Sequence, residues 1–511
     1  ATVSLNDSTP NWSVYLFKLA QPLLPGDSLA MNYKLQQTSN AFAINKSIVN
    51  NGSYLNQTNF EPLLGYVERF EINDKFERKN RGLNAKVPLT SDRSKPNSYG
   101  KFITQKRSFE AVLSTSSEQT AVTSGQLIKT WQQDGRNYFH YKTQQAIYPL
   151  VGYFSAAYET KRIEHNGIEV EMYFHPDHKQ NIDEMLRATQ ATLDYATTNL
   201  GPYAYNSLRI LEVPAYHPFG GKAAAGVVAL SEGLYTEDYS DDAAINNTAR
   251  NTIHEVLHQW WGEKLVPKIT QGEGVLVESL TKYMEMVILE KMYGKNMARQ
   301  LTKYTQRRYF SGRAYASSVE VAVVDAYKET YLNYGKGPVV FTALKELLGE
   351  QKLNSAFKQL IESHKYTLSA TTDDLLSALF DIADDSQKGL IQDWLTKVIE
   401  YDLAINNAVV SELADGRYEV VIDVKALRLS TDKDGLVSEI GIDESIKIAL
   451  YRAYPGRRST EALSITNQLI NKTNSTITLI VEDKPSYVMI DPNYTRLDKD
   501  LSNNINKIEE K

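Results

Sequence analysis

The 511-residue sequence contains no cysteine. Disulfide bonds, catalytic thiolates and zinc sites with sulfur ligands are therefore excluded, and any metal ion must be bound by His, Asp or Glu. The absence of thiols suits either side of a membrane. No run of about 18 apolar residues occurs, and the first residues lack the basic and apolar segments of a signal peptide. We expect the chain as given to be soluble, either as a mature product or as a domain of a longer protein.

The sequence also lacks a large excess of positive or negative charge. The net charge is -6 at pH 7 and no block of like charges occurs. This argues against a nucleic acid as partner, because nucleic-acid binders need basic clusters for the phosphates. With 42% hydrophobic and 23% charged residues, the composition is that of a folded globular protein. The length exceeds what one hydrophobic core supports, so we expect about two to four domains.

Residues 1–158 read as strands and turns. Short β-branched or aromatic runs such as EAVLST (residues 110–115) alternate with breaks rich in Pro, Gly and Asn, which predicts a β-sandwich-like domain. From residue 159 the periodicity changes: a strand at Ile168–Tyr173 precedes helical spacing over residues 181–200. Helices are then expected to dominate up to residue 400, the last of them at QDWLTKVIEY (residues 392–401).

Two further domains follow from this pattern. Residues 159–400 form a mixed α/β domain that becomes all-helical. Afterwards the alternation of apolar and polar residues returns in YEVVIDV, IKIALY and STITLIVED, which predicts a small β-domain over residues 401–511. Its last residues, NNINKIEEK, are expected to form a polar tail. The predicted fold class is multidomain α+β.

The segment INNTARNTIHEVLHQWWGEKL carries the clearest chemistry. Its apolar residues recur at helical spacing, and a glycine and a proline then end the run. His254 and His258 lie four residues apart on one helix face, which is a metal-chelating spacing, and Glu255 projects beside them. With 8 histidines and 62 acidic residues, chance gives about 0.015 such matches. We therefore predict a zinc site with Glu255 as the general base.

A catalytic zinc ion needs a third protein ligand and an open position for water. Four acids follow the histidines: Glu263, Glu273, Glu278 and Glu285. Glu263 ends the first helix and Glu273 reads as part of a turn, QGEG. Glu278 instead interrupts the almost wholly apolar helix VLVESLTKYMEMVILEKMYG, where a carboxylate is costly unless it is paired or bound to metal. We predict that Glu278 completes the ligand set of one Zn²⁺ per chain, the alternative being a solvent-facing carboxylate at a helix end.

The run HEVLHQWWGEKLVPKITQGEGVLVESLTKY resembles the aminopeptidase N family of gluzincins, in which HExxH is followed by a Glu that opens the next helix. The gap here is 19 residues, Gln259 to Val277, one more than is usual, and the extra residue falls in a loop. The chain is most similar to the peptidase domains fused to ABC transporter permeases, which carry segments like RYFSGR and YGKG. The resemblance covers nearly the whole chain.

This resemblance implies a thermolysin-like catalytic domain and a peptide substrate. It also implies a covalent or non-covalent link to a membrane permease, with the chain as an extracytoplasmic domain of a membrane-associated protein. The family's Tyr-x-Lys-Gly sequence corresponds to YGKG, which assigns Tyr334 to stabilisation of the oxyanion. Without the resemblance, Tyr334 is one of 32 tyrosines, most of which pack or cap.

The substrate-binding loop departs from the family. Its aminopeptidases carry a Gly-x-Met-Glu-Asn loop whose Glu binds the free α-amino group. Aligned on the strand GVVALSE, this chain reads GGKAA, so Ala223 takes the position of that Glu. Glu232 is either its substitute or an exposed loop carboxylate. The predicted substrate-binding residues are therefore Gly220, Gly221, Ala223 and Glu232.

Three readings of the function remain open. The first is zinc-dependent, aminopeptidase-like hydrolysis of peptides; the second is a weakly active or inactive peptide-binding accessory module of a membrane transporter. The third is an endopeptidase with an open cleft, because the small β-domain is not followed by the large helical domain of many relatives. Arg307, Arg308 and Arg313 are candidates for binding carboxylates or form a solvated helix face. His175 and His178 are read as a surface loop rather than a second metal site.

Overall fold

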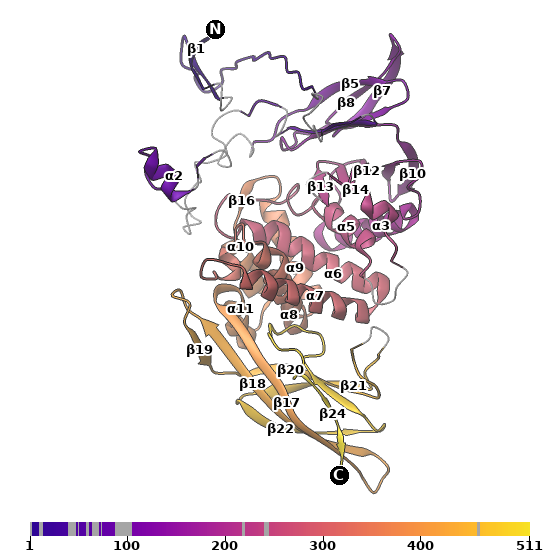
Figure 1. The fold of residues 1–511 in the computed structure, drawn as a ribbon, viewed down its shortest axis with the longest axis vertical. Coiled ribbons are helices and arrows are strands. Elements are labelled where there is room, and N and C mark those ends of the chain that lie inside the picture. Colours follow the sequence, from indigo (N-terminus) through magenta and orange to yellow (C-terminus); the bar gives the residue numbers. More distant parts are fainter. Residues whose placement is uncertain are drawn as a thin grey trace. The chain divides into compact units, whose positions relative to one another are not determined.

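The computed structural model describes residues 3–9, 14–38, 47–49, 51–57, 61–63, 71–72, 74–86, 105–216, 220–239, 245–456 and 460–511. Residues 1–45 and residues 46–511 form two compact units. In the first unit, β1 (Val3–Thr9) pairs antiparallel with β2 (Val14–Leu19) (Figure 1). Of the helices in the described ranges, none has the length and apolarity needed to cross a membrane.

In the early part of the second unit, the described residues form two antiparallel sheets and one short helix. The sheets contain, in spatial order, β3 (Ile48–Val49), β4 (Gly52–Asn56), β9 (Gly152–Ala156) and β6 (Thr120–Val122), and then β5 (Glu110–Ser116), β8 (Arg136–Lys142) and β7 (Gln126–Gln133). The helix is α2 (Lys75–Asn80). Tyr141 of β8 is fully buried and donates a 3.0 Å hydrogen bond to the Ala121 carbonyl of β6. This contact joins the two sheets.

A mixed five-stranded sheet follows. Its spatial order is β10 (Glu159–His165), β11 (Ile168–Phe174), β12 (Ser207–Val213), β14 (Val227–Ser231) and β13 (Gly221–Ala224). The three central strands are parallel and the two outer strands pair antiparallel. Strand β12 is buried on both faces, and its buried residues include the charged Arg209 and Glu212. Helices α3 (Ile182–Leu200) and α5 (Asn247–Leu257) lie beside this sheet (Figure 1).

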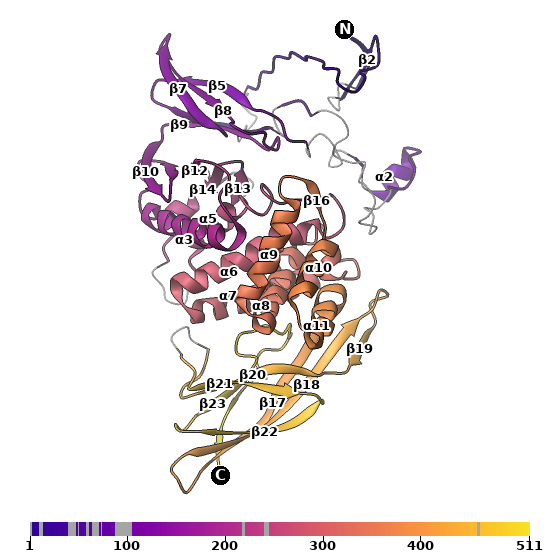
Figure 2. The same ribbon diagram turned by 180° about the vertical axis from the view of Figure 1, so that it is seen from behind.

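Helices form the next layer, with a short two-stranded sheet beside them (Figure 2). The helical elements are α4 (Gly233–Thr236), the π-helical turn η3 (Val275–Ser279), α6 (Leu280–Tyr293), α7 (Lys295–Ala314), the 3-10 turn η4 (Val323–Asp325), the π-helical turn η5 (Leu332–Lys336), α8 (Gly337–Leu348), α9 (Glu350–His364), α10 (Thr372–Ile382) and α11 (Asp385–Thr396). The small sheet pairs β15 (Val266–Pro267) with β16 (Leu368–Ala370). Every residue of α6 from Leu280 to Leu289 is buried, which explains why its sequence is apolar almost all round.

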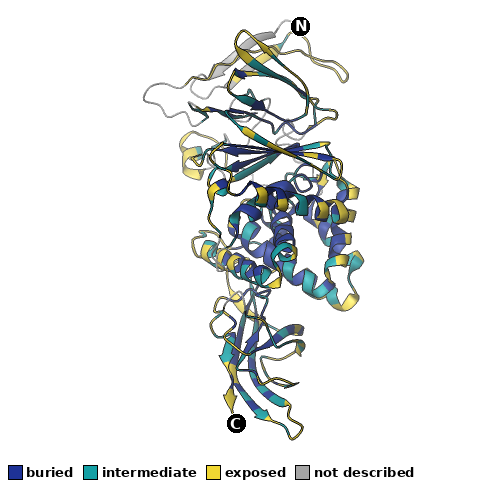
Figure 3. Cartoon of the chain, turned by 90° about the vertical axis from the view of Figure 1, so that its right-hand side faces the viewer, coloured by how far each residue is buried: buried dark blue, intermediate teal, exposed yellow. Residues whose placement is uncertain are grey.

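The chain ends in two further sheets. The first contains β19 (Val437–Ile440), β18 (Tyr418–Thr431), β17 (Val398–Glu412) and β25 (Glu509–Glu510), with β22 (Asn474–Val481) also paired to β18; the second contains β21 (Ser464–Ile470), β20 (Glu444–Tyr451), β23 (Tyr487–Ile490) and β24 (Ile505–Lys507). Buried residues alternate with half-buried ones along β18, whereas the second half of β20 is buried throughout (Figure 3). The three apolar runs singled out from the sequence lie in β18, β20 and β22.

Two details differ from the sequence-based expectations. The helix predicted over residues 392–401 ends at Thr396, and β17 begins at Val398. Val398, Ile399 and Tyr401 bury their side chains in strand geometry, so tertiary packing overrides the local helical pattern. The expected polar tail forms β24 and β25, which pair with β23 and β17. The alternating pattern of the tail therefore indicates strands, although its composition is polar.

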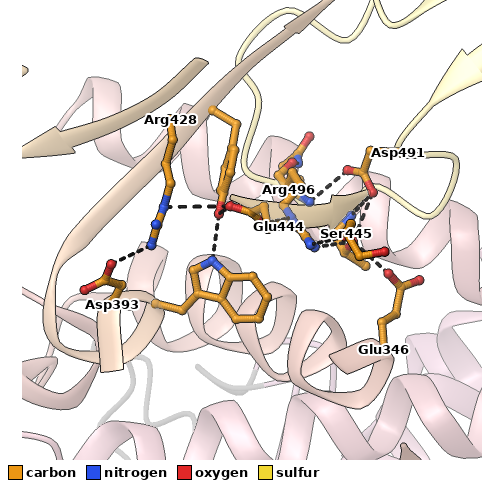
Figure 4. Close-up of polar contacts among 11 residues, drawn as sticks. Glu346, Asp393, Arg428, Glu444, Ser445, Asp491 and Arg496 are labelled. Carbon is orange, nitrogen blue, oxygen red and sulfur yellow. Dashed lines mark hydrogen bonds and ion pairs between the residues drawn. The ribbon is translucent and has the colours of Figure 1, made fainter. Parts of the chain in front are cut away.

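A buried network of charged and polar groups joins the last sheets to the helices (Figure 4). Arg496 donates a 2.8 Å hydrogen bond to Glu444 of β20. Arg428 of β18 donates at 2.7 Å to Asp393 of α11. Lys447 of β20 reaches Glu346 of α8 at 2.7 Å. These ion pairs fix the C-terminal strands against α8 and α11.

The model is mixed α and β, with several sheets and a block of helices. This agrees with a multidomain α+β protein. The domain boundaries near residues 158 and 400, the β-sandwich-like description and the thermolysin-like description stay predictions.

Candidate active site

Helix α5 presents the two predicted histidine ligands and the predicted base. Asn246 caps its N-terminus by accepting a 2.9 Å hydrogen bond from the Ala249 amide, which is a favourable cap. His254 and Glu255 lie in its last turns and His258 directly follows its last residue. The rings of His254 and His258 are 4.9 Å apart and almost perpendicular. The predicted helix and the shared face are therefore present.

Glu278 of η3 meets both imidazoles. Its Oε2 atom lies 3.4 Å from His254 Nε2 and 3.7 Å from His258 Nε2. Ligands at about 2.0–2.2 Å from a tetrahedral zinc ion lie roughly 3.3–3.6 Å from one another, so these separations suit a zinc ion. Glu278 Oε2 is buried and accepts no hydrogen bond. Of the residues that the structure describes, only these three form a His/Asp/Glu group spaced for a metal ion.

The ionisation of this group also favours a cation. Burial lowers the pKa of His254, but the contacts with Glu278 and Glu285 outweigh burial and raise it to about 9. Burial raises the pKa of Glu278, but the two histidines outweigh it and hold this pKa at about 2. The carboxylates thus attract positive charge between the side chains. A divalent cation bound by the same atoms would replace the proton on His254.

The other ring nitrogen of each histidine has an acceptor. His254 Nδ1 lies 3.1 Å from Glu285 Oε2, and His258 Nδ1 donates to the Trp261 carbonyl at 2.9 Å. Both contacts place the proton on Nδ1 and leave the Nε2 lone pair for a metal. Glu285 is itself held by Lys282, and Arg250 lies 3.9 Å away. The ring orientations are therefore fixed by buried groups.

Two π-helical turns place Glu278 and Tyr334 together. Glu278 lies in η3, which opens α6, and Tyr334 lies in η5, which opens α8. Ser279 donates a 2.8 Å hydrogen bond to the Asn333 carbonyl and so joins the turns. A Cβ atom at Gly337 would lie 2.3 Å from Ser279 Oγ, which explains the second glycine of YGKG. π-helical turns are frequent at functional sites.

The ring of Tyr334 lies 6.0 Å from that of His254. Burial and then the charge of Glu278 raise the pKa of Tyr334 above its ordinary value, which keeps the phenol protonated. Tyr334 is thus a hydrogen-bond donor at the edge of the histidine cluster. The guanidinium of Arg308, from α7, lies over its ring at 4.7 Å from the centroid.

Glu255 lies against the edge strand β13. A Cβ atom at Gly221 would lie 2.5 Å from both Cγ and Oε1 of Glu255, so only a glycine leaves space for this carboxylate. Burial raises the pKa of Glu255 above its ordinary value, and the two histidines act in the opposite direction. A carboxylate with a raised pKa is a stronger base. Ala223 lies two residues along the same strand and offers no charged group.

The remaining predicted residues have other neighbours. Glu232 precedes α4, and its electrostatic neighbours are Tyr54, Tyr216 and Glu212. His175 and His178 also meet Glu212: the His175 amide donates to it at 2.7 Å and the His178 ring contacts its other oxygen. Gly220 directly precedes β13, and a Cβ atom there would contact nothing within 4 Å.

Sequence reasoning missed several groups of this site. Glu285 was weighed only as a metal ligand, but it faces the far side of the His254 ring. It lies seven residues after Glu278 and so on the same helix face, and this spacing is a usable signal. The Trp261 carbonyl lies only three residues after His258, but a backbone group carries no signal of residue type. The stacking of Arg308 on Tyr334 has no local sequence signal, because it depends on how α7 meets η5.

Comparison with known proteins gives partial matches. Residues 184–394 match the family model described as the Peptidase family M1 domain. The chain is 24% identical over 289 residues to Endoplasmic reticulum aminopeptidase 2 of Homo sapiens, which covers 54% of this chain and 30% of that protein. It is 22% identical over 250 residues to Glutamyl aminopeptidase of Bos taurus, covering 46% and 26%.

A third match is to Tricorn protease-interacting factor F2 of Thermoplasma acidophilum, at 21% identity over 219 residues, which is 41% of this chain and 28% of that protein. In each of these alignments the chain spans less than a third of the relative's length. The matched segment 184–394 contains all four residues of the histidine and glutamate cluster and Tyr334. The M1 domain match and the aminopeptidase relatives together support the aminopeptidase N family of gluzincins for this chain.

Proposed function

We propose that this chain is a zinc-dependent peptidase that hydrolyses peptide bonds. The convergence of His254, His258 and Glu278 on one point, with Glu255 beside them, carries the proposal. The M1 domain match and the aminopeptidase relatives support peptide hydrolysis. The substrate is a peptide.

His254 Nε2, His258 Nε2 and Glu278 Oε2 would hold one zinc ion per chain. When bound, zinc supplies Lewis acidity, which polarises the scissile carbonyl and lowers the pKa of water from 15.7 to about 7. Glu285 and the Trp261 carbonyl keep the imidazoles in the tautomer that leaves Nε2 free. A zinc ion at this point would also provide a partner for Glu278 Oε2, which accepts no hydrogen bond.

Glu255 acts as the general base and then as the general acid. It takes a proton from the attacking water and later delivers it to the leaving amine. Gly221 leaves the space in which this carboxylate lies. Tyr334 donates a hydrogen bond to the oxyanion that develops on the carbonyl oxygen, which is the usual role of a preorganised phenol.

The action is aminopeptidase-like by resemblance, but the amine anchor differs. Ala223 has no carboxylate for a substrate α-amino group, and Glu232 lies near Glu212. Internal cleavage is therefore the second candidate. The third is a peptide-binding accessory module of a membrane transporter, and the link to a permease with an extracytoplasmic location belongs to that part of the proposal.

A peptide panel tests these candidates. Peptides with free and with acetylated N-termini would be incubated with wild type and with Glu255→Gln, and products identified by mass spectrometry. We expect zinc-dependent cleavage by wild type and a loss of about 10²–10⁴-fold in Glu255→Gln, whose zinc content stays the same. Absence of cleavage in every zinc-loaded sample would contradict the proposal that the chain is an enzyme.

The pattern of products separates the two modes of action. Release of N-terminal residues from free peptides alone supports aminopeptidase action. Internal cuts, or cleavage of acetylated peptides, contradict strict aminopeptidase action and support the endopeptidase candidate.

A further inference from the structure

Arg308 is an exposed cation beside the candidate active site. It lies on α7, and its guanidinium sits over the face of Tyr334. Tyr334 in turn lies next to Glu278 and 6.0 Å from the His254 ring, centroid to centroid. Arg308 also lies close enough to the buried Lys282 to lower its pKa. The guanidinium is therefore at the edge of the reacting centre.

The other two arginines of this segment have different surroundings. Arg313 pairs at 3.0 Å with Glu320, a fully buried acid that Lys336 also contacts at 2.7 Å. Arg307 is exposed on the same helix as Lys303, whose pKa is lowered by burial first and then by the charge of Arg307. Neither Arg307 nor Arg308 forms an ion pair with any residue in the ranges that the structure describes. Arg308 differs from Arg307 because it lies over Tyr334 at the candidate site, where its N–H groups remain available for a ligand.

Stacking on Tyr334 prepares this group for an anion. A guanidinium that lies over an aromatic ring keeps N–H groups free at its edges, and these edges match a carboxylate through two parallel hydrogen bonds. Less side-chain entropy is lost on binding because the planar group is already ordered. The stacking also explains why a charged side chain stays near the site without a protein carboxylate.

Strand β13, which lies against Glu255, shows the complementary feature. A carboxylate at position 223 would attract an amine, but this chain has Ala223 there, and β13 contains no acidic residue. The described cation near the reacting centre that lacks a partner is thus Arg308. The charge pattern fits a substrate with a negative group rather than one fixed by its amine.

We propose that Arg308 binds a carboxylate group of the peptide substrate and so determines specificity. This inference rests on the proposed peptidase function. The carboxylate has two sources with the same chemistry: an acidic side chain near the scissile bond, or the free C-terminus of a short peptide. Both accept the same bidentate hydrogen bonds.

The test measures binding without turnover. Zinc-loaded Glu255→Gln, with and without Arg308→Gln, would be titrated calorimetrically with two matched pairs of acetylated hexapeptides. The first pair differs by Glu against Gln at the central position, and the second by a free against an amidated C-terminus. Arg307→Gln is the control, because it removes the neighbouring exposed charge on the same helix.

We expect the anionic member of one pair to bind at least 10-fold more tightly than its neutral partner. Arg308→Gln should remove this difference, whereas Arg307→Gln should retain it, and the pair affected identifies the source of the carboxylate. If Arg308 only positioned Tyr334, Arg308→Gln would change turnover of neutral and anionic peptides equally in the Glu255-containing enzyme. Equal binding of both members in both pairs, or no binding at all, overturns the inference.

A separate assay detects failure of the proposed peptidase function. Hydrolysis of the same peptides by the otherwise wild-type chain reports on the proposed peptidase activity, whereas the titrations use a variant without the base. A chain that binds the anionic peptides through Arg308 but cleaves none of them keeps this inference and contradicts the proposed function.

Discussion

The molecule contains two buried clusters of charge with opposite character. In the cluster between the last sheets and the helices, Arg496 meets Glu444 and Arg428 meets Asp393, so opposite charges lie within hydrogen-bonding distance. In the active-site cluster, Glu255, Glu278 and Glu285 lie around two histidines, and Glu278 Oε2 has no hydrogen-bond partner.

This difference in pairing suggests different roles for the two clusters. The cluster of Arg496 and Arg428 supports the fold, and the histidine and glutamate cluster belongs to the proposed function. Buried ion pairs that satisfy each other hold elements in place, and breaking one leaves an uncompensated charge. A buried acid without a partner instead indicates a missing ligand. Changes in the first cluster should therefore affect stability, and changes in the second should affect metal binding and catalysis.

The largest expected effect belongs to the structural cluster. Arg496→Met leaves the fully buried Glu444 without its closest partner, so we expect the free energy of unfolding to fall by about 3–5 kcal/mol. Urea denaturation measures this change, with Arg417→Met as the control. Arg417 pairs with Asp415 on the surface, where a pair contributes about 0–1 kcal/mol. A loss below about 1 kcal/mol for Arg496→Met would remove the distinction between the clusters.

Gly221→Ala should affect catalysis and not metal binding. The added Cβ atom must displace the Glu255 carboxylate, and a displacement of about 1 Å costs roughly 10²-fold in rate. Peptide hydrolysis and zinc content are measured on the same samples. The control is Gly233→Ala, where an added Cβ atom meets nothing within 4 Å. Unchanged kcat in Gly221→Ala contradicts the assigned place of Glu255 in the mechanism.

Glu285→Gln should weaken zinc binding by about 10–100-fold, because groups that orient metal ligands have effects of this size. Competition with a chromogenic chelator measures the affinity. Glu290→Gln, on the same helix, is the matched control, since Glu290 contacts Lys345 and not a histidine. Equal zinc affinity in Glu285→Gln and wild type would show that the His254 contact does not support the metal site.

A further expected effect is a pH dependence of the free energy of unfolding that comes from Glu263, a buried acid just after the histidine helix. Burial raises its pKa from 4.5 to about 8, partly offset by Lys106. Between these values the folded state holds a proton that the unfolded state releases, so stability falls as pH rises. Glu263→Gln should flatten this decline in urea denaturation between about pH 5 and 8. An identical slope in both proteins contradicts the assignment.

Some features of the candidate site are encoded locally in the sequence, and others depend on contacts between distant segments. The spacing of His254 and His258 on one helix follows from four residues of separation, and Glu278 is conspicuous in an apolar helix. The strand at Val398 and the strands of the tail depend on partners distant in sequence. The stacking of Arg308 on Tyr334 likewise arises only when α7 meets η5, although Arg308 was a carboxylate candidate from its charge.

Metal content is the most direct test of the central claim. Purified wild type, dialysed against zinc and then against buffer, should contain one zinc ion per chain by inductively coupled plasma mass spectrometry. Glu278→Gln and His258→Ala should each lose most of it, with circular dichroism unchanged. A wild-type chain that retains no zinc, or variants that retain as much as wild type, would contradict the assignment of His254, His258 and Glu278 as the metal site.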